Sequence, residues 1–195
     1  ASFYLLAKKR VEGEKRIDQV LEREPDNIKA LYLKGGLLIS EKADTREIET
    51  IYEKIINLDS SQTKAMVVLA ELSRTGGDKE KALALLKKAV ETEPDNISIH
   101  QSLFVYYLKE KDVGSAQAVL ENLVDLKPGE IQPRIMLANF YTGRGKTDLA
   151  EAQFLKAVDL APDNPLPHLL AARFYNAQKA PDKAEKFIKK ALAID

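Results

Sequence analysis

The chain has 195 residues, with 30 lysines and arginines balanced by 30 aspartates and glutamates, so its formal net charge is zero. That balance argues against nucleic-acid binding, which normally needs a basic excess, and the 45% of hydrophobic residues argue against a disordered chain. The absence of cysteine excludes disulfides, thiolate nucleophiles and cysteine-ligated zinc.

The N-terminal residues 1–10, ASFYLLAKKR, place an apolar run before a basic cluster, which is the reverse of a secretory signal. They also lack an initiator methionine, so we expect the natural chain to begin earlier. Farther along, the longest mostly apolar stretch, Met66–Ala70, is much shorter than the ~20 residues that a membrane-spanning helix needs. We therefore expect no membrane insertion.

A short polar segment recurs along the chain. The sequence EPDNI occurs at Glu24–Ile28 and again at Glu93–Ile97, and APDNP at Ala161–Pro165 is a near copy. The equivalent positions are Pro25, Ser60, Pro94, Pro128 and Pro162, with spacings of 35, 34, 34 and 34 residues. A fixed period indicates a repeat architecture. Because proline ends a helix and Asp or Asn caps the next one, we interpret each copy as a joint between helices.

Each repeat is predicted to contain two helices. In residues 63–96, small or apolar side chains recur at helical spacing in two series. The first series is Met66, Leu69, Ala70 and Ser73, and the second is Ala82, Leu85, Leu86, Ala89 and Val90. Between them, TGGD at Thr75–Asp78 supplies the breaker and capping residues of a turn.

Small and aromatic residues keep the same position from repeat to repeat. The alanine positions are Ala70, Ala138 and Ala172; Ala82, Ala116, Ala150 and Ala184; and Ala89, Ala157 and Ala191. The tyrosine positions are Tyr107, Tyr141 and Tyr175. Two helices approach closely only where the side chains at their crossing are small. Replacing Ala82 or Ala150 with leucine is therefore expected to overpack the crossing.

The period, the alanine and tyrosine positions and the closing proline resemble the tetratricopeptide repeat family. The resemblance implies an all-α fold, a right-handed α-solenoid of antiparallel helix pairs in a single array over residues 1–195. The predicted repeats are 1–27 (truncated), 28–62 (divergent), 63–96, 97–130 and 131–164 (full), and 165–195 (missing its final turn). The divergent repeat has an extra residue near Ala43, Lys34 at a usually apolar position, and Ser60 in place of proline.

No residue is predicted to perform catalysis. His100 and His168 lie two repeats apart, too far along a stack of helices to share a metal ion. We interpret them as filling the groove that holds Leu31 and Met66 in earlier repeats. Carboxylate pairs and short basic runs near helix ends are interpreted as charged surface. We therefore predict that the chain is not an enzyme and has no cofactor, metal or nucleic-acid partner.

A second stripe of residues lies beside the core series of each predicted first helix, at spacing i, i+4, i+7. This first-helix stripe comprises Tyr32, Gly36 and Ile39; Val67, Glu71 and Arg74; Gln101, Val105 and Leu108; Ile135, Asn139 and Thr142; and Leu169, Arg173 and Asn176. In tetratricopeptide proteins the corresponding positions line a concave groove. The resemblance thus implies a non-catalytic scaffold that binds an extended peptide or a helix of a partner protein.

One family variant, a clamp for a terminal carboxylate, is not expected. Some members hold that carboxylate with lysine, asparagine and arginine at set positions. The matching residues here are Val67 with Glu71, Ser102, and Gln132 with Met136. None of these provides a cation.

Two alternative functions remain open from the sequence. The segment Phe187–Ile194 carries an apolar face without a capping helix, so the repeats could be a structural module that self-associates through its ends. The chain could also be a helper domain of a larger enzyme or of a bacterial envelope-assembly lipoprotein. Arrays of this style occur in the bacterial cytoplasm and envelope, and both locations are compatible with the absence of cysteine.

Overall fold

The structure of the protein is a computed structural model that describes residues 10–194, so residues 1–9 of the predicted truncated repeat lie outside the described residues. Within the described residues every regular element is a helix. The helices are α2 (Arg10–Arg23), α3 (Ile28–Glu41), α4 (Thr45–Leu58), α5 (Thr63–Thr75), α6 (Lys79–Thr92), α7 (Ile97–Lys109), α8 (Val113–Leu126), α9 (Ile131–Gly143), α10 (Thr147–Leu160), α11 (Pro165–Ala177) and α12 (Pro181–Ile194). The predicted all-α fold is confirmed.

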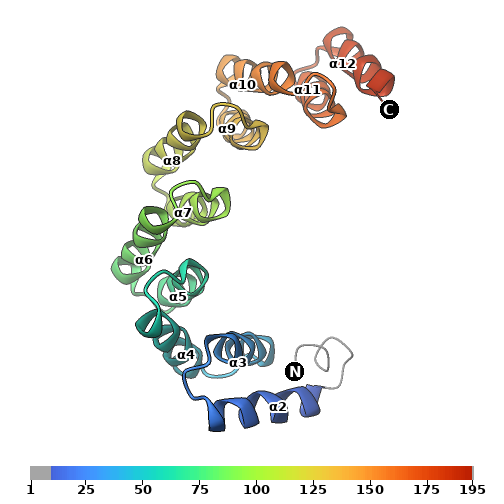
Figure 1. Cartoon of the computed structure of the whole chain (residues 1–195). Coiled ribbons are helices and arrows are strands. Elements are labelled where there is room, and N and C mark those ends of the chain that lie inside the picture. Colours follow the sequence, from blue (N-terminus) through green and yellow to red (C-terminus); the bar gives the residue numbers. More distant parts are fainter. Residues whose placement is uncertain (1–9, 195) are drawn as a thin grey trace. The chain divides into compact units, whose positions relative to one another are not determined.

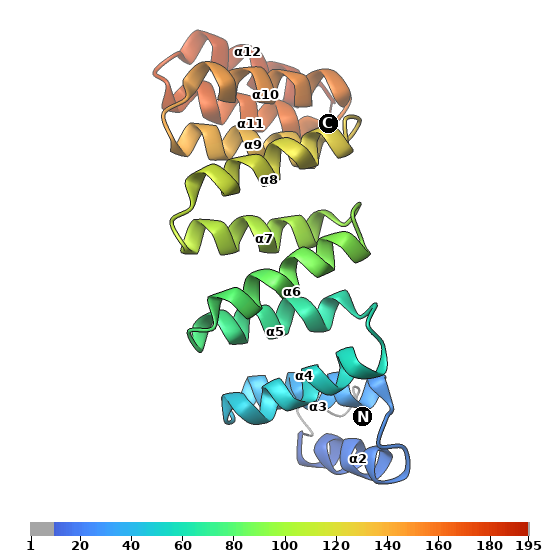
Figure 2. The same ribbon diagram turned by 90° about the vertical axis from the view of Figure 1, so that its left-hand side faces the viewer.

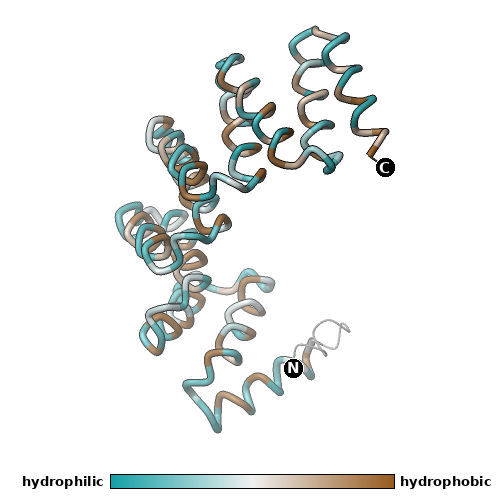
Figure 3. Tube along the Cα trace, turned by 45° about the horizontal axis from the view of Figure 1, so that its top comes forward, coloured by the Kyte–Doolittle hydropathy of each residue, from teal (hydrophilic) through white to brown (hydrophobic). Residues whose placement is uncertain are grey.

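The helices belong to two compact units that divide between Ser102 and Leu103, inside α7. Within each unit, successive helices run in alternate directions and are joined by short turns (Figures 1 and 2). Both hydrophobic and hydrophilic residues occur along individual helices, as Figure 3 shows. Each helix can thus bury one face against its neighbours and leave another in solvent.

Local sequence explains where the helices begin. The side chain of Asn27 accepts a hydrogen bond from the amide of Ala30 at 3.0 Å, and it caps α3. Asp78 accepts from the amide of Lys81 at 2.9 Å at the start of α6. These caps satisfy amide groups that have no partner inside the helix.

The turn within each repeat contains one residue with positive φ. Gly77 has φ of 97° and Gly145 has φ of 68°, and glycine adopts this conformation without steric cost. In the divergent repeat Lys42 takes this role, with φ of 54°. The amides of Lys42 and Ala43 bond to carbonyls three and five residues earlier, as those of Gly77 and Asp78 do. Asp44 then adds a separate cap before α4. The extra residue of this repeat therefore lies in the turn.

The divergent repeat also pairs a glycine with a large aromatic residue. A Cβ atom at Gly35, which occupies the position of Ala70 in the next repeat, would lie 2.8 Å from the ring of Tyr52. Nearby, the ammonium group of Lys34 lies 3.0 Å from Asp18 and 3.6 Å from Glu14 of α2. Burial lowers the pKa of Lys34, but these hydrogen bonds and charges outweigh burial and raise it. Lysine is accommodated because acidic partners come from the preceding helix.

The joints are held by a side-chain pair that explains the recurring EPDN sequence. Asn27 donates to Glu24 at 2.7 Å, and Asn96 donates to Glu93 at the same distance. At residues 59–62 a glutamine donates to an aspartate, also at 2.7 Å. In these three joints the first and last side chains are bonded to each other, so these residues serve the fold.

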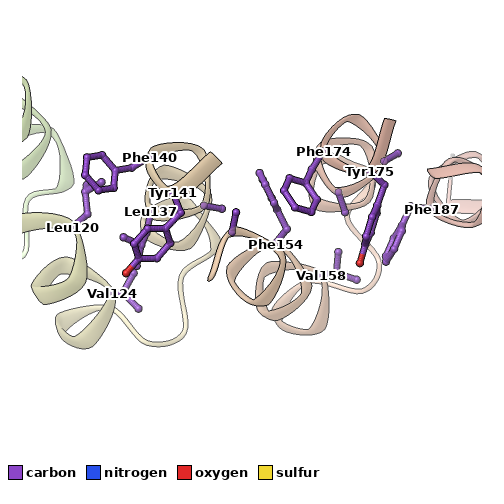
Figure 4. Packing of buried hydrophobic residues seen from close by; sticks show 14 of the residues in the cluster. Leu120, Val124, Leu137, Phe140, Tyr141, Phe154, Val158, Phe174, Tyr175 and Phe187 are labelled. Carbon is purple, nitrogen blue, oxygen red and sulfur yellow. The ribbon is translucent and has the colours of Figure 1, made fainter. Parts of the chain in front are cut away.

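The core of the second unit is built on small residues at the helix crossings. Ala116, Ala150 and Ala157 are fully buried, and large side chains fill the space beside them. The rings of Phe154 and Phe174 lie 5.2 Å apart between their centroids (Figure 4). This packing holds α9, α10 and α11 in contact.

Tyrosine hydroxyls tie first helices to the second helix of the preceding repeat. Tyr141 of α9 donates to Glu121 of α8 at 2.6 Å, and Tyr175 of α11 donates to Glu151 of α10 at 2.7 Å. Lys183 of α12 donates to the same carboxylate at 3.0 Å. The hydrogen bond from Tyr175 and then that from Lys183 lower the pKa of Glu151. One carboxylate therefore connects three consecutive helices.

Replacing Ala150 with leucine should lower the free energy of unfolding by roughly 1 to 3 kcal/mol, because the added atoms enter a crossing with no space. Ala150 is 0% exposed, whereas Ala152 in the same helix is exposed. Urea denaturation of Ala150→Leu and of the control Ala152→Leu measures the difference. Equal stability of the two variants would contradict the role of the alanine crossing.

The Tyr175–Glu151 bond should make part of the stability depend on pH. Since the folded state lowers the pKa of Glu151, its contribution is complete above about pH 5 and is lost as the pH falls below about 4.5. The destabilisation caused by Tyr175→Phe should therefore be larger at neutral pH than in acid, as measured by urea denaturation. Tyr107→Phe is the matched control, since among the described residues no carboxylate bonds to that hydroxyl. A loss from Tyr175→Phe that does not change with pH would refute the assignment.

Candidate functional site

The two histidines lie near the start of α7 and of α11, and each contacts the joint before its helix. His100 is 2% exposed and its Nε2 lies 2.8 Å from the carbonyl oxygen of Pro94. His168 is 3% exposed and its Nε2 lies 2.9 Å from the carbonyl oxygen of Pro162. A carbonyl oxygen only accepts, so Nε2 is the donor in both bonds. Each histidine thus fastens its helix to the joint six residues earlier.

Arg134 takes the same role in the repeat between the histidines. Its Nη2 donates to the carbonyl oxygen of Pro128 at 3.1 Å. We call this place in the repeat the joint position; its residues are Leu31, Met66, His100, Arg134 and His168. Since three different repeats bond the same carbonyl from this position, its role is structural. Among the described residues, no group of three or more His, Cys, Asp and Glu side chains could hold a metal ion.

In the first unit, part of the first-helix stripe is already occupied by contacts within the chain. The guanidinium of Arg74 donates to Glu71 through Nη2 at 2.9 Å and through Nε at 3.0 Å. The hydroxyl of Tyr32 donates to Gln62 at 3.1 Å, and its ring packs against the core. Val67 is half-buried and Gln101 is exposed. The charges of this part of the stripe therefore neutralise each other.

In the second unit the stripe is more open. Leu169 is 49% exposed and Val105 is 37% exposed, and the polar side chains Asn139, Arg173 and Asn176 are exposed as well. The remaining members, Leu108, Ile135 and Thr142, are half-buried. Apolar and polar side chains thus share an accessible surface formed by first helices.

A cavity of about 370 Å³ opens between α9 and α11. Its lining residues are Asn139, Thr142, Gly143, Phe154, Leu170, Arg173, Phe174 and Ala177. The stripe residues Asn139, Thr142 and Arg173 meet here. The apolar lining includes the paired rings of Phe154 and Phe174 (Figure 4). We call this feature the α9–α11 cavity; it combines an aromatic wall with polar side chains.

The polar side chains of the cavity differ in whether other groups of the chain form hydrogen bonds or ion pairs with them. The hydroxyl of Thr142 donates to the carbonyl oxygen of Ala138 at 2.8 Å, so its oxygen remains an acceptor. Among the described residues, the guanidinium of Arg173 has no ion pair, hydrogen bond or ring contact. No acidic residue lies within four positions of Arg173 along α11. The cavity therefore has a cation without a compensating anion.

Two sequence profiles described as tetratricopeptide repeat match the chain, one at residues 63–96 and one at residues 135–195. The chain is a tetratricopeptide repeat protein. The predicted solenoid of antiparallel helix pairs is thereby supported from both sequence and structure. A search of curated protein sequences gave no significant match.

Several solved structures share the fold. PilF of Pseudomonas aeruginosa is 16% identical, with a TM-score of 0.65 and coverage of 94% of this chain and 83% of that chain. PilW, described as a type IV pilus biogenesis factor, is 15% identical, with a TM-score of 0.65 and coverage of 98% and 89%. YrrB, described as a tetratricopeptide protein with an unusual peptide-binding site, is 20% identical, with a TM-score of 0.53 and coverage of 92% of each chain.

Sequence reasoning found only part of the cavity lining of this tetratricopeptide protein. It missed Gly143, Phe154, Leu170, Phe174 and Ala177. Phe154 belongs to a second helix, and Phe174 and Leu170 follow the core periodicity of α11, so none lies on the stripe. The large residue Phe154 stands where other repeats have Leu86 and Leu120, which is the one available signal.

Within the described residues, no helix is long and apolar enough to cross a membrane.

The joint position can be tested by removing its donors. His100→Met should lower the free energy of unfolding by about 1 kcal/mol, because one hydrogen bond is lost while an apolar side chain still fills the space. His168→Met should cost less, since His168 also has a buried Nδ1 without a partner, and removing it relieves a desolvation penalty. Urea denaturation measures both. A larger loss from His168→Met than from His100→Met would contradict this reading.

Proposed function

We propose that this tetratricopeptide protein is a non-catalytic scaffold that binds an extended peptide or a helix of a partner protein on its first-helix stripe. The proposal rests on one observation: in a single first helix, the stripe residues are exposed while other side chains are buried in the core. In α11, Leu169 and Arg173 are exposed, whereas Ala171 and Ala172 are buried in the core. Since packing of the second unit uses other side chains, these stripe residues are available to a partner.

The chemistry of the stripe favours a peptide over a small metabolite. Successive members lie about one helical turn apart, and their apolar residues Val105, Ile135 and Leu169 come from three different helices. An extended ligand could place spaced apolar side chains against them. Exposed Asn139 and Arg173 would add hydrogen bonds to the ligand backbone or to its charged groups.

The similarity to YrrB adds support at the level of the fold, because that protein is described as having a peptide-binding site. We further propose that the helix pairs of this chain act together as one array from residue 1 to residue 195.

Self-association is a second candidate function, favoured by the apolar residue Leu192, which is 72% exposed on α12.

A display library of random dodecapeptides, selected on the immobilised chain, should yield peptides that depend on the stripe. The double variant Asn139→Ala and Leu169→Ser should weaken the recovered peptides about tenfold or more, since two contacts of about 1 kcal/mol or more each are removed. Fluorescence anisotropy of the labelled peptides measures the affinity, and light scattering of the chain over a concentration series reports self-association.

The matched control is Asn122→Ala with Leu160→Ser, which makes the same two changes at exposed positions of the second helices α8 and α10. It should leave peptide affinity unchanged, and both double variants should keep the helical content of the parent. Equal weakening by the two double variants, or a library that yields no binding peptide, would refute the proposal. Assembly without peptide binding would instead favour self-association.

A further inference from the structure

We propose that the α9–α11 cavity selects a peptide in which a carboxylate side chain lies close to an aromatic or branched apolar side chain. The apolar side chain would enter the cavity, and the carboxylate would pair with Arg173. This inference rests on the peptide-binding function proposed above and adds the chemistry of the ligand. It concerns the second unit alone.

The apolar part of the inference comes from the cavity lining. Phe154 and Phe174 are both buried at 4% exposure, with their ring planes tilted by 41°. Leu170 is half-buried beside them, and Gly143 contributes no side chain. A ligand methyl group or ring placed here loses contact with water against an apolar surface, which is the favourable term in such binding. An entirely polar ligand would leave this surface unused.

The role of Arg173 in binding a carboxylate is inferred by comparing the stripe of the second unit with that of the first. Glu71 in the first unit and Arg173 in the second unit hold the same place in their repeats, three repeat periods apart. In the first unit the arginine of the stripe, Arg74, is neutralised by Glu71 at 2.9 Å. Arg173 has no such partner among residues 10–194. Of these two arginines, only Arg173 has an uncompensated guanidinium to which a ligand carboxylate could bind.

The form of the cation also favours a carboxylate. A guanidinium presents parallel N–H donors that match the two oxygens of a carboxylate, and bonds of this kind are stronger than neutral ones. Asn139 and the acceptor oxygen of Thr142 lie in the same cavity lining. They are suited to hydrogen bonds with the peptide backbone on either side of the carboxylate. The cavity therefore offers an apolar surface for the apolar side chain of the peptide, a guanidinium for its carboxylate, and polar groups for its backbone.

The inference is tested with defined peptides. The probes are four fluorescein-labelled dodecapeptides of glycine, serine and threonine, each with one Phe and one Glu separated by one to four residues. In matched peptides Glu is replaced by Gln or by Lys. At low salt at least one Glu probe should bind about tenfold more tightly than its Gln counterpart. The difference should shrink as the salt concentration rises, because the pair lies at an exposed site.

Variants of Arg173 connect the preference to the cavity. Arg173→Gln should abolish the tenfold difference, and Arg173→Glu should reverse it in favour of the Lys probe. The control Arg144→Gln removes the same charge from the turn after α9, outside the cavity lining, and should preserve the difference. Since Arg173 makes no internal contact among the described residues, both of its variants are expected to melt like the parent. The guanidinium of Arg144 lies 5.6 Å from the centroid of the Phe140 ring, so the melting of the control variant is measured beside them.

Three results would overturn the inference. They are equal binding of the Glu and Gln probes, a Glu preference that survives Arg173→Gln, and no binding of any probe. None of these removes the proposed function, since peptides recovered from the library would still depend on Asn139 and Leu169. Failure of that selection would refute the proposed function itself, so the two failures are distinguishable.

Discussion

Close approach of helices at alanine is the constraint on which the rest of this structure depends. Ala116, Ala150 and Ala157 are fully buried at crossings, where a small side chain lets the helices approach closely. Because the crossings fix which face of each helix is buried, they also fix which face remains accessible. The first-helix stripe is thus a consequence of packing, although its exposed members, such as Leu169 and Arg173, lie outside that packing.

Polar contacts then fix each helix in its rotation and position. Tyr175 reaches back to Glu151, and Lys183 reaches the same carboxylate from the following helix. At the joints, His100 bonds the carbonyl of Pro94 and Arg134 bonds that of Pro128. These contacts connect neighbouring elements only, which is typical of repeat proteins, in which each repeat interacts with the next.

The elements could be predicted from the sequence because their signals are local. A period of 34 residues, capping residues such as Asp78, and the alanine positions specify helices and turns without knowledge of distant contacts. The cavity could not be derived in this way, because it depends on Phe154 from one repeat meeting Phe174 from the next. Likewise, Lys34 departs from the apolar pattern, and only the structure shows that it forms an ion pair with an acidic side chain of α2. Phe154 and Lys34 both depart from the leucines found at the equivalent positions of other repeats, so the period does not predict these two contacts.

The joint position has a consequence for how such a protein can change in length. The bond from His168 to the backbone carbonyl of Pro162 spans six residues and joins the end of one predicted repeat to the start of the next. Leu31 and Met66 fill the same position without any polar bond. Because the acceptor is a backbone carbonyl, which every residue has, a repeat copied by gene duplication would bring its own donor, and the preceding repeat would need no compensating substitution. The chain can gain or lose recognition surface one helix pair at a time, and each new stripe can diverge independently.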